Sequence, residues 1–150
     1  MSTTDDNPGA DSPGPHPDLR SLDRLVGTWS LSGDTDGTVT YEWMAGGYFL
    51  LQHVDRVLYG HAVQGMEVIG HWRQWGEGAS GDILSRTYDA AGNTFDYVYE
   101  VDEHTLAIWA GVRNAPSFYR GEFSADGRTN AGAWVYEGGG GYASTMTRKD

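Results

Sequence analysis

The hydrophobic pattern changes its period once along the chain, just after residue 26. Before that point, in "PDLRSLDRLVG", three leucines and a valine recur at helical spacing, which predicts one short amphipathic helix. Asp18 can cap the N-terminus of this helix, and Gly27 can end it. Beyond Gly27, apolar and polar residues alternate with a period of two. That alternation is typical of half-buried β-strands.

Nine polar turn clusters divide the rest of the chain at a spacing of roughly a dozen residues. They are GDTDG, AGG, YGH, GEGASG, DAAGN, VDEH, RNAPS, SADGR and EGGGG. Nine turns separate ten strands, and no helical stretch lies between them, which argues against a βαβ fold. Because an open sheet of this size leaves two exposed edges, closure is favoured. We predict an all-β fold, a ten-stranded antiparallel up-and-down β-barrel with a short N-terminal helix, as a single domain from residue 17 to 150.

Alternation assigns faces in some strands and fails in others. In "TVTYEWM" Val39, Tyr41 and Trp43 share one face. In "TFDYVYEV" the residues that share a face are Phe95, Tyr97, Tyr99 and Val101. In "YFLLQHV" both faces carry apolar groups, so the sequence leaves open which face of residues 48–58 points inward.

The longest segment between turns, residues 62–75, carries two glycines. Gly65 and Gly70 suggest bulges or bends in a long, curled strand.

Residues 1–16 contain mostly Pro, Gly, Asp, Ser and Thr, which predicts a disordered tail. Whether this tail covers the barrel as a lid is left open. The N-terminus has no basic region followed by an apolar one, and no run of residues is long enough to span a bilayer, so we expect a cytoplasmic protein. The net charge of −11 argues against nucleic acid and membrane surfaces as partners. The absence of cysteine removes disulfides and thiolate chemistry.

A ten-stranded barrel is wide enough to enclose a small ligand, and this chain has six Trp, nine Tyr, four Phe and four Met residues to line such a cavity. We therefore expect a small apolar or aromatic ligand. The predicted ligand-binding residues are Tyr41, Trp43, His53, Met66, Tyr97, Tyr99, Trp109, Arg120 and Trp134. A homodimer is possible, because the sequence does not show whether outer aromatic residues are exposed.

The chain resembles the calycin group, which contains the lipocalins and fatty-acid-binding proteins. The resemblance rests on a short helix followed by "GTW", and on "MTRKD" at the end of the last strand. It implies that Trp29 closes one end of the barrel beneath Arg148, in a stack of guanidinium on indole. A larger part of the chain, from Leu19 to Arg148, is similar to uncharacterised bacterial lipocalin-like proteins through "LVGTW", "EWMAGGYFL", "QGMEVIGHW", "YDAAGNTFDYVY", "YRGEFSADGRT" and "GGYASTMTR". No activity comes with this likeness.

The chain is more distantly similar to nitrobindin-like haem barrels. These take their axial histidine from near the C-terminus, and this chain has no histidine after His104. We therefore expect no haem and no other cofactor. His53 and Asp55 share a strand face, but two ligands without a third do not predict a metal site, so no metal is expected either.

Two classes of function fit these features best. The first is intracellular binding of a small hydrophobic or aromatic molecule in the barrel cavity. The alternative is a cofactor-free cyclase or isomerase acting on a natural-product-like substrate, with His53 and Asp55 as an oriented base or Arg120 and Glu122 at a substrate carbonyl. If His53 and Asp55 face solvent, binding is favoured. A ligand-free interaction barrel is the third class, and it requires a completely filled interior.

Overall fold

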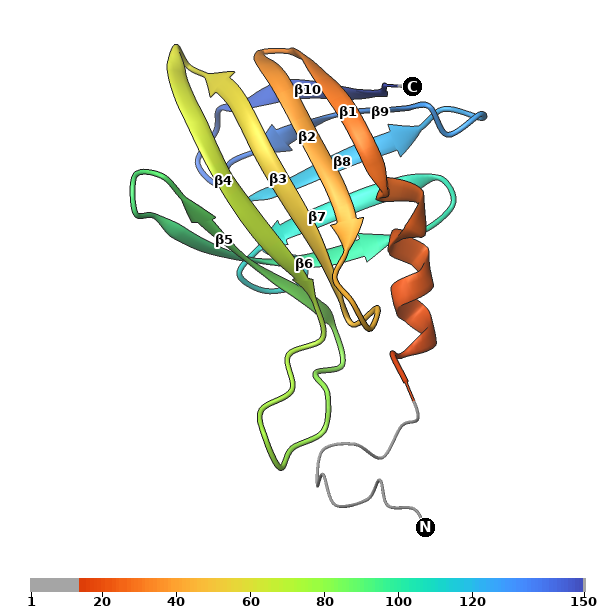
Figure 1. Ribbon diagram of the computed structural model, residues 1–150. Helices are drawn as coiled ribbons and strands as arrows, with labels where there is room; N and C mark the ends of the chain where they lie inside the picture. The colour runs from red at the N-terminus through yellow and green to blue at the C-terminus, as the bar shows by residue number, and fades with distance from the viewer. Residues whose placement is uncertain (1–13, 150) are drawn as a thin grey trace.

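The computed structural model of the chain describes residues 14–149 and has a closed barrel of ten antiparallel strands. Each strand pairs with its neighbours in sequence, and the last strand pairs with the first. The strands are β1 (Gly27–Gly33), β2 (Thr35–Trp43), β3 (Phe49–Leu58), β4 (His61–Gly70), β5 (Ile83–Asp89), β6 (Thr94–Val101), β7 (Thr105–Ala110), β8 (Phe118–Phe123), β9 (Thr129–Val135) and β10 (Gly141–Arg148). A short helix, η2 (Pro17–Leu25), lies at one end of the barrel (Figure 1). The predicted fold class and strand number are confirmed.

Helix η2 is a 3₁₀ helix. Its leucines, Leu19, Leu22 and Leu25, are three residues apart, so in a helix with three residues per turn they lie on one face, and all three are buried. The cap is His16, whose ring nitrogen accepts a hydrogen bond from the backbone N–H of Asp18 at 3.2 Å. The assignment of Asp18 as the cap was therefore wrong, and His16 belongs to the helix start. The rest of the predicted tail, residues 1–13, lies outside the described residues.

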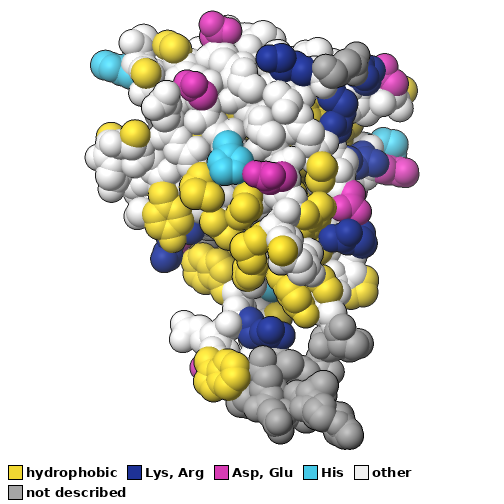
Figure 2. Space-filling view, in the orientation of Figure 1, with side chains coloured by type: hydrophobic (Ala, Val, Ile, Leu, Met, Phe, Trp, Pro, Cys, Tyr) yellow, Lys and Arg dark blue, Asp and Glu magenta, His cyan; other side chains and the backbone are white. Residues whose placement is uncertain are grey.

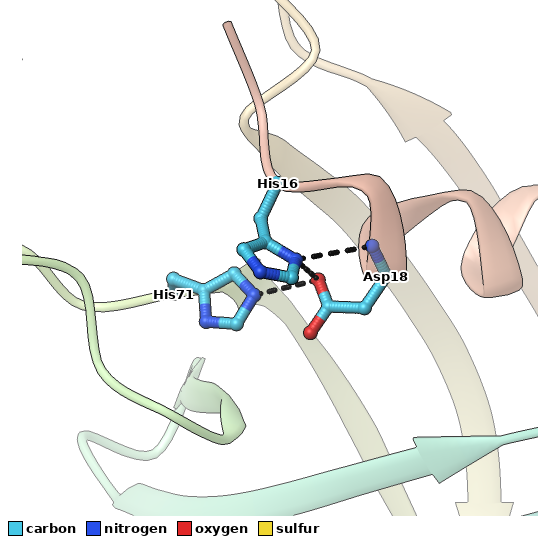
Figure 3. Close-up of side chains that lie close together, drawn as sticks. All are labelled: His16, Asp18 and His71. Atoms are coloured by element: carbon cyan, nitrogen blue, oxygen red, sulfur yellow. Dashed lines mark hydrogen bonds and ion pairs between the residues drawn. The ribbon is translucent and has the colours of Figure 1, made fainter. Parts of the chain in front are cut away.

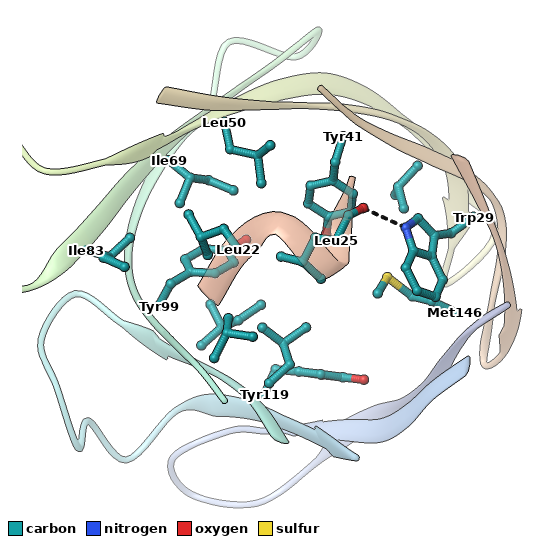
Figure 4. Packing of buried hydrophobic residues seen from close by; sticks show 14 of the residues in the cluster. Leu22, Leu25, Trp29, Tyr41, Leu50, Ile69, Ile83, Tyr99, Tyr119 and Met146 are labelled. Carbon is teal, nitrogen blue, oxygen red and sulfur yellow. Dashed lines mark hydrogen bonds between the residues drawn. The ribbon is translucent and has the colours of Figure 1, made fainter. Parts of the chain in front are cut away.

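The buried face of η2 fills one end of the barrel. Figure 4 shows Leu22 and Leu25 in the middle of the ring of strands, surrounded by side chains that point inward from the strand walls. Leu50 from β3 and Ile69 from β4 are among these and have no solvent exposure. This end is closed by the helix, and we call it the helix end. The opposite end carries the β1–β2, β3–β4, β5–β6, β7–β8 and β9–β10 connections, and we call it the turn end.

Trp29 joins the helix to the first and last strands. Its indole is completely buried, and its Nε1–H donates a hydrogen bond to the carbonyl of Leu25 at 2.8 Å. The guanidinium carbon of Arg148 lies 4.2 Å from the ring centroid, as the calycin resemblance implied. The Nη atoms of Arg148 donate to the carbonyls of Val26 and Arg24, at 2.5 and 2.7 Å.

Gly27 is required at the join between η2 and β1. Its φ of +124° lies in a region that favours glycine, and a Cβ there would collide with the guanidinium of Arg148. The helix itself ends at Leu25, so Gly27 begins β1 and does not terminate the helix as expected.

The face of β3 that the sequence left open is now fixed. Leu50, Gln52, Val54 and Arg56 point into the barrel, while His53 on the alternate face is exposed. The sequence could not show this because both faces of the strand are partly apolar.

The expected bulges in β4 do not occur: the register of β4 with β3 and with β5 is continuous. Gly65 serves another purpose: a Cβ there would collide with the backbone oxygen of Tyr88, so glycine lets β5 approach closely. The strand also ends at Gly70, and residues 71–82 form a loop where the sequence predicted a longer strand.

Large hydrophobic side chains are exposed near the helix end. Figure 2 shows them gathered over the lower half of the barrel face and on the loop below it. They include Met44 in the β2–β3 turn and Trp72 and Trp75 in the β4–β5 loop, with Trp75 75% exposed. None of the helices described within residues 14–149 is long and apolar enough to cross a bilayer.

Replacing Trp29 with alanine should lower the free energy of unfolding by about 3–5 kcal/mol, because a fully buried indole leaves a cavity between η2, β1 and β10. Urea unfolding followed by circular dichroism measures this loss. Trp75→Ala is the matched control, because its exposed side chain should contribute little. An equal, small effect of both substitutions would contradict the structural role of Trp29.

Candidate functional site

The barrel is not completely filled, and a cavity of about 190 Å³ remains inside it. The cavity extends from the middle of the barrel toward the turn end, where Arg56, Val63 and Phe95 lie near the β3–β4 and β5–β6 turns. Its walls combine aliphatic and aromatic side chains with a small number of polar groups. The lining includes Leu31, Val39, Tyr41, Gln52, Val54, Arg56, Met66, Glu67, Phe95, Tyr97, Tyr99, Leu106, Ile108, Tyr119, Trp134, Ser144 and Met146.

The main polar group in the deep part of the cavity is Glu67, on β4. Its side chain is buried, and the residue is only 3% exposed. Tyr99 donates its hydroxyl hydrogen to Oε1 at 2.7 Å, and Ser85 donates to Oε2 at 2.6 Å. These two donors come from β6 and β5, the next two strands in the barrel wall. The carboxyl group is therefore held in a fixed orientation.

Burial dominates the electrostatics of this group. Removal from water raises the pKa of Glu67 above its ordinary value, although the hydrogen bonds from Ser85 and Tyr99 and the charge of Arg56 act in the opposite direction. Burial also raises the pKa of Tyr99 well above its ordinary value, and the nearby Glu67 adds to this effect. The pKa of Tyr97 is raised to about 12 by the same two causes. The site therefore favours uncharged side chains.

A second polar group lies nearer the turn end. Arg56, on β3, donates from Nη1 to the hydroxyl of Tyr142 at 2.9 Å, and its guanidinium carbon lies 5.7 Å from the centroid of that ring. Its Nε–H is buried and has no hydrogen-bond partner among the described residues. Arg56 is the only basic residue in the described lining of the cavity.

Five of the nine predicted ligand-binding residues line the cavity: Tyr41, Met66, Tyr97, Tyr99 and Trp134. The other four do not, so these expectations are corrected. Trp43 is on the inward face of β2, but the helix occupies the space there: the indole N–H donates to Asp23 at 2.9 Å and Arg20 covers the ring. Trp109 and Arg120 alternate with inward-facing neighbours and lie on the outside of β7 and β8.

The residues proposed for catalysis also lie outside the cavity. His53 and Asp55 are exposed on the outer face of β3, and His53 Nε2 contacts Glu42 Oε2 at 3.1 Å. Arg120 and Glu122 are exposed on the outer face of β8. An oriented base at His53 and Asp55 is therefore not available to a molecule in the cavity.

Glu67 and Arg56, two charged side chains that line the cavity, are absent from the site residues predicted from the sequence. The signal was weak because "VQGMEVIG" has apolar residues at both even and odd positions, so alternation does not show that Glu67 points inward. The register with β3 supplies that information: Glu67 is opposite Gln52, on the inward face.

The described residues place no group of three histidine or carboxylate ligands in the cavity; the one such group in residues 14–149 lies at the helix end. Comparison of the chain with protein-family models and with curated proteins finds no match to either.

Stability should depend on pH through Glu67. Because its pKa is raised in the folded state, folded protein holds a proton that the unfolded chain has released above about pH 4.5, the ordinary value for the group. The free energy of unfolding should fall as pH rises from there to the pKa of Glu67 in the folded state, by up to about 1.4 kcal/mol per pH unit.

Glu67→Gln removes this titration, so its unfolding free energy should depend less on pH over the same range. Urea unfolding at several pH values measures both profiles. Glu122→Gln, at an exposed position of β8, is the matched control. Parallel pH profiles for wild type and Glu67→Gln would show that burial does not perturb Glu67.

Proposed function

We propose that the barrel binds a small, largely apolar, aromatic molecule that carries an uncharged hydrogen-bonding group such as a hydroxyl. The observation that carries this proposal is a partly empty, mostly apolar cavity with one oriented carboxyl group, Glu67, in its deep part. Ligand sites typically combine an apolar wall with a few fixed polar groups in this way.

The preference for an aromatic ligand is supported by the rings on one wall. Trp134 packs against Tyr97 and Tyr119, with ring centroids 5.6 and 5.9 Å apart and tilted planes. All three line the cavity. A flat ligand can extend this cluster through tilted or offset contacts.

The preference for an uncharged ligand is supported by Glu67. An anionic group beside it would be placed next to a buried carboxyl group, while the one basic residue of the described lining, Arg56, is bonded to Tyr142 nearer the turn end, so burying the anion there is costly. A hydroxyl can both donate and accept a hydrogen bond, so it suits Glu67 in either protonation state. We expect the polar end of the ligand to lie at Glu67 and its apolar body to extend toward Trp134.

Two further points favour binding over the other classes. His53 and Asp55 face solvent, and the interior is not filled by side chains. The likeness to calycins and to bacterial lipocalin-like proteins is in keeping with a ligand-binding barrel, and the closed ten-stranded fold is consistent with that group. A cytoplasmic location stays a prediction.

Three naphthalene derivatives test the proposal. 2-Naphthol offers a hydroxyl, 2-methoxynaphthalene lacks the donor, and 2-naphthoate is an anion. We expect 2-naphthol to quench tryptophan fluorescence saturably and to bind about tenfold more tightly than 2-methoxynaphthalene. A hydrogen bond missing at a buried polar group costs about 1–3 kcal/mol, and tenfold in affinity corresponds to about 1.4 kcal/mol. 2-Naphthoate should bind more weakly than 2-naphthol.

The variants locate the binding site. Trp134→Phe should lose most of the quenching, and Glu67→Ala should lose the preference for 2-naphthol over its methyl ether. Trp75→Phe, in the exposed β4–β5 loop, should leave quenching unchanged. Tightest binding of 2-naphthoate, or quenching that does not depend on Trp134, would refute the proposed arrangement.

One observation favours the alternative of a cofactor-free isomerase or cyclase. A buried carboxyl group with a raised pKa in a cavity is a candidate proton donor or acceptor, and Tyr99 is hydrogen-bonded to it. Such an enzyme would exchange a ligand C–H for deuterium in D₂O, and mass spectrometry of a molecule that co-purifies with the barrel would detect this. Exchange by wild type and not by Glu67→Gln favours catalysis. Absence of exchange favours binding alone.

A further inference from the structure

Three potential metal ligands meet at the helix end, outside the cavity. His16 caps η2, Asp18 lies in its first turn, and His71 begins the β4–β5 loop. One ligand atom from each residue lies within 4.8 Å of the other two. Figure 3 shows the two imidazole rings and the carboxylate converging from these separate segments.

The orientation of His71 is fixed by its second ring nitrogen. Nδ1 lies 2.7 Å from the backbone carbonyl of Ser80, which can only accept, so Nδ1 carries the hydrogen. In the neutral ring Nε2 then presents a lone pair, and Nε2 is the atom directed at Asp18, 2.8 Å from Oδ1. Histidines that bind metals typically donate their other N–H to a carbonyl or carboxylate in this way.

The burial of His71 also favours metal binding. The side chain of His71 is only 7% exposed, so its lone pair has little access to bulk water. Nδ1 of His16 lies 3.0 Å from the same Oδ1 of Asp18 and also presents a lone pair, because it accepts the backbone N–H of Asp18. With both rings neutral, three acceptor atoms thus face one another, whereas a proton on either ring would make an ion pair with Asp18. A cation between them satisfies all three.

We propose that His16, Asp18 and His71 bind a divalent transition metal ion such as Zn²⁺. Two imidazole nitrogens and one carboxylate oxygen form a common set of zinc ligands. Tetrahedral zinc with bonds near 2.0–2.1 Å places its ligand atoms about 3.3 Å apart, so the separations of 2.8 and 3.0 Å from Asp18 to the two histidines need to open by a few tenths of an ångström. The two histidine nitrogens, which lie within 4.8 Å of each other, need to reach the same separation, and the exposed His16 is the ring that can move. The long bond between Asp18 N–H and His16, at 3.2 Å, is given up.

The surroundings leave room for the rest of the coordination sphere. A hollow beside Asp18 is lined by Ser21 and Asp82, and His16 is 61% exposed, so water can reach the metal. The nearby cation, Arg113, is paired with Asp82 at 2.7 Å and with Glu100 at 3.1 Å. Its charge is therefore largely compensated.

Bound metal would link segments 53 residues apart in sequence, the start of η2 and the base of the β4–β5 loop. It would hold the helix in place over the closed end of the barrel. No metal was expected from the sequence, because His53 and Asp55 lack a third ligand; His16, Asp18 and His71 come together only in the folded chain.

The test uses the full chain without an affinity tag, stripped with EDTA and titrated with zinc chloride against a chromophoric zinc indicator. We expect one zinc ion per chain and a rise in thermal midpoint with zinc concentration. His16→Ala and Asp18→Asn should weaken binding by at least about tenfold and abolish the rise in midpoint. Because His16 is exposed, its replacement should leave the apo protein folded, whereas His71→Gln also disturbs the loop.

His104→Ala and His53→Ala are the matched controls, because both histidines are exposed and lie outside the cluster. They should leave zinc affinity unchanged. Cobalt substitution adds a spectrum that reports coordination by imidazole nitrogen. No saturable binding, or zinc binding that is unaffected by His16→Ala and Asp18→Asn, would overturn the proposal. The zinc titration contains no ligand for the barrel cavity, so its outcome is independent of the proposed binding function.

Discussion

The buried indole of Trp29 is the contact on which the closed end of the barrel depends. It lies on β1, its N–H bonds the last residue of η2, and Arg148 from β10 covers its face. The same guanidinium bonds two carbonyls at the end of the helix. The pair of Trp29 and Arg148 thus holds η2 against β1 and β10 and fixes the position of the helix end of the barrel.

This arrangement confines the cavity. With three leucines of η2 and inward side chains such as Leu50 filling the helix end, the remaining space lies in the middle of the barrel and toward the turn end. Glu67 is at the depth where the packed core meets the cavity, and it contacts Tyr99 and Ser85. Burial keeps its pKa high, so the deep part of the site accepts hydrogen-bonding groups and disfavours anions.

Much of the fold could be predicted from local pattern, and less of the site. Turn clusters separated the ten strands, and the shared face of Tyr97 and Tyr99 followed from alternation. His53 and Trp109 were misplaced, because aromatic and ionisable residues occur on both sides of these strands and only the register with a neighbour decides which side faces inward. Trp43 has the expected face, yet the helix occupies the space beside it.

The hydrophobic pattern of the sequence does not predict contacts between residues that are far apart in the chain. Glu67 and Tyr99 are separated by 32 residues, and Asp18 and His71 by 53, so neither pair has a signal in local spacing. The β4–β5 and β5–β6 pairings bring the first pair together, and packing of η2 against the β4–β5 loop brings the second. Both depend on the tertiary structure that the strand pairings create.

The most direct test of the proposed site is a crystal structure of the protein soaked with 2-naphthol. The ring should lie inside the barrel against Trp134, with its hydroxyl oxygen within hydrogen-bonding distance of the Glu67 carboxyl group. A ring bound outside the barrel, or inside it with the hydroxyl directed away from Glu67, would contradict the proposed site.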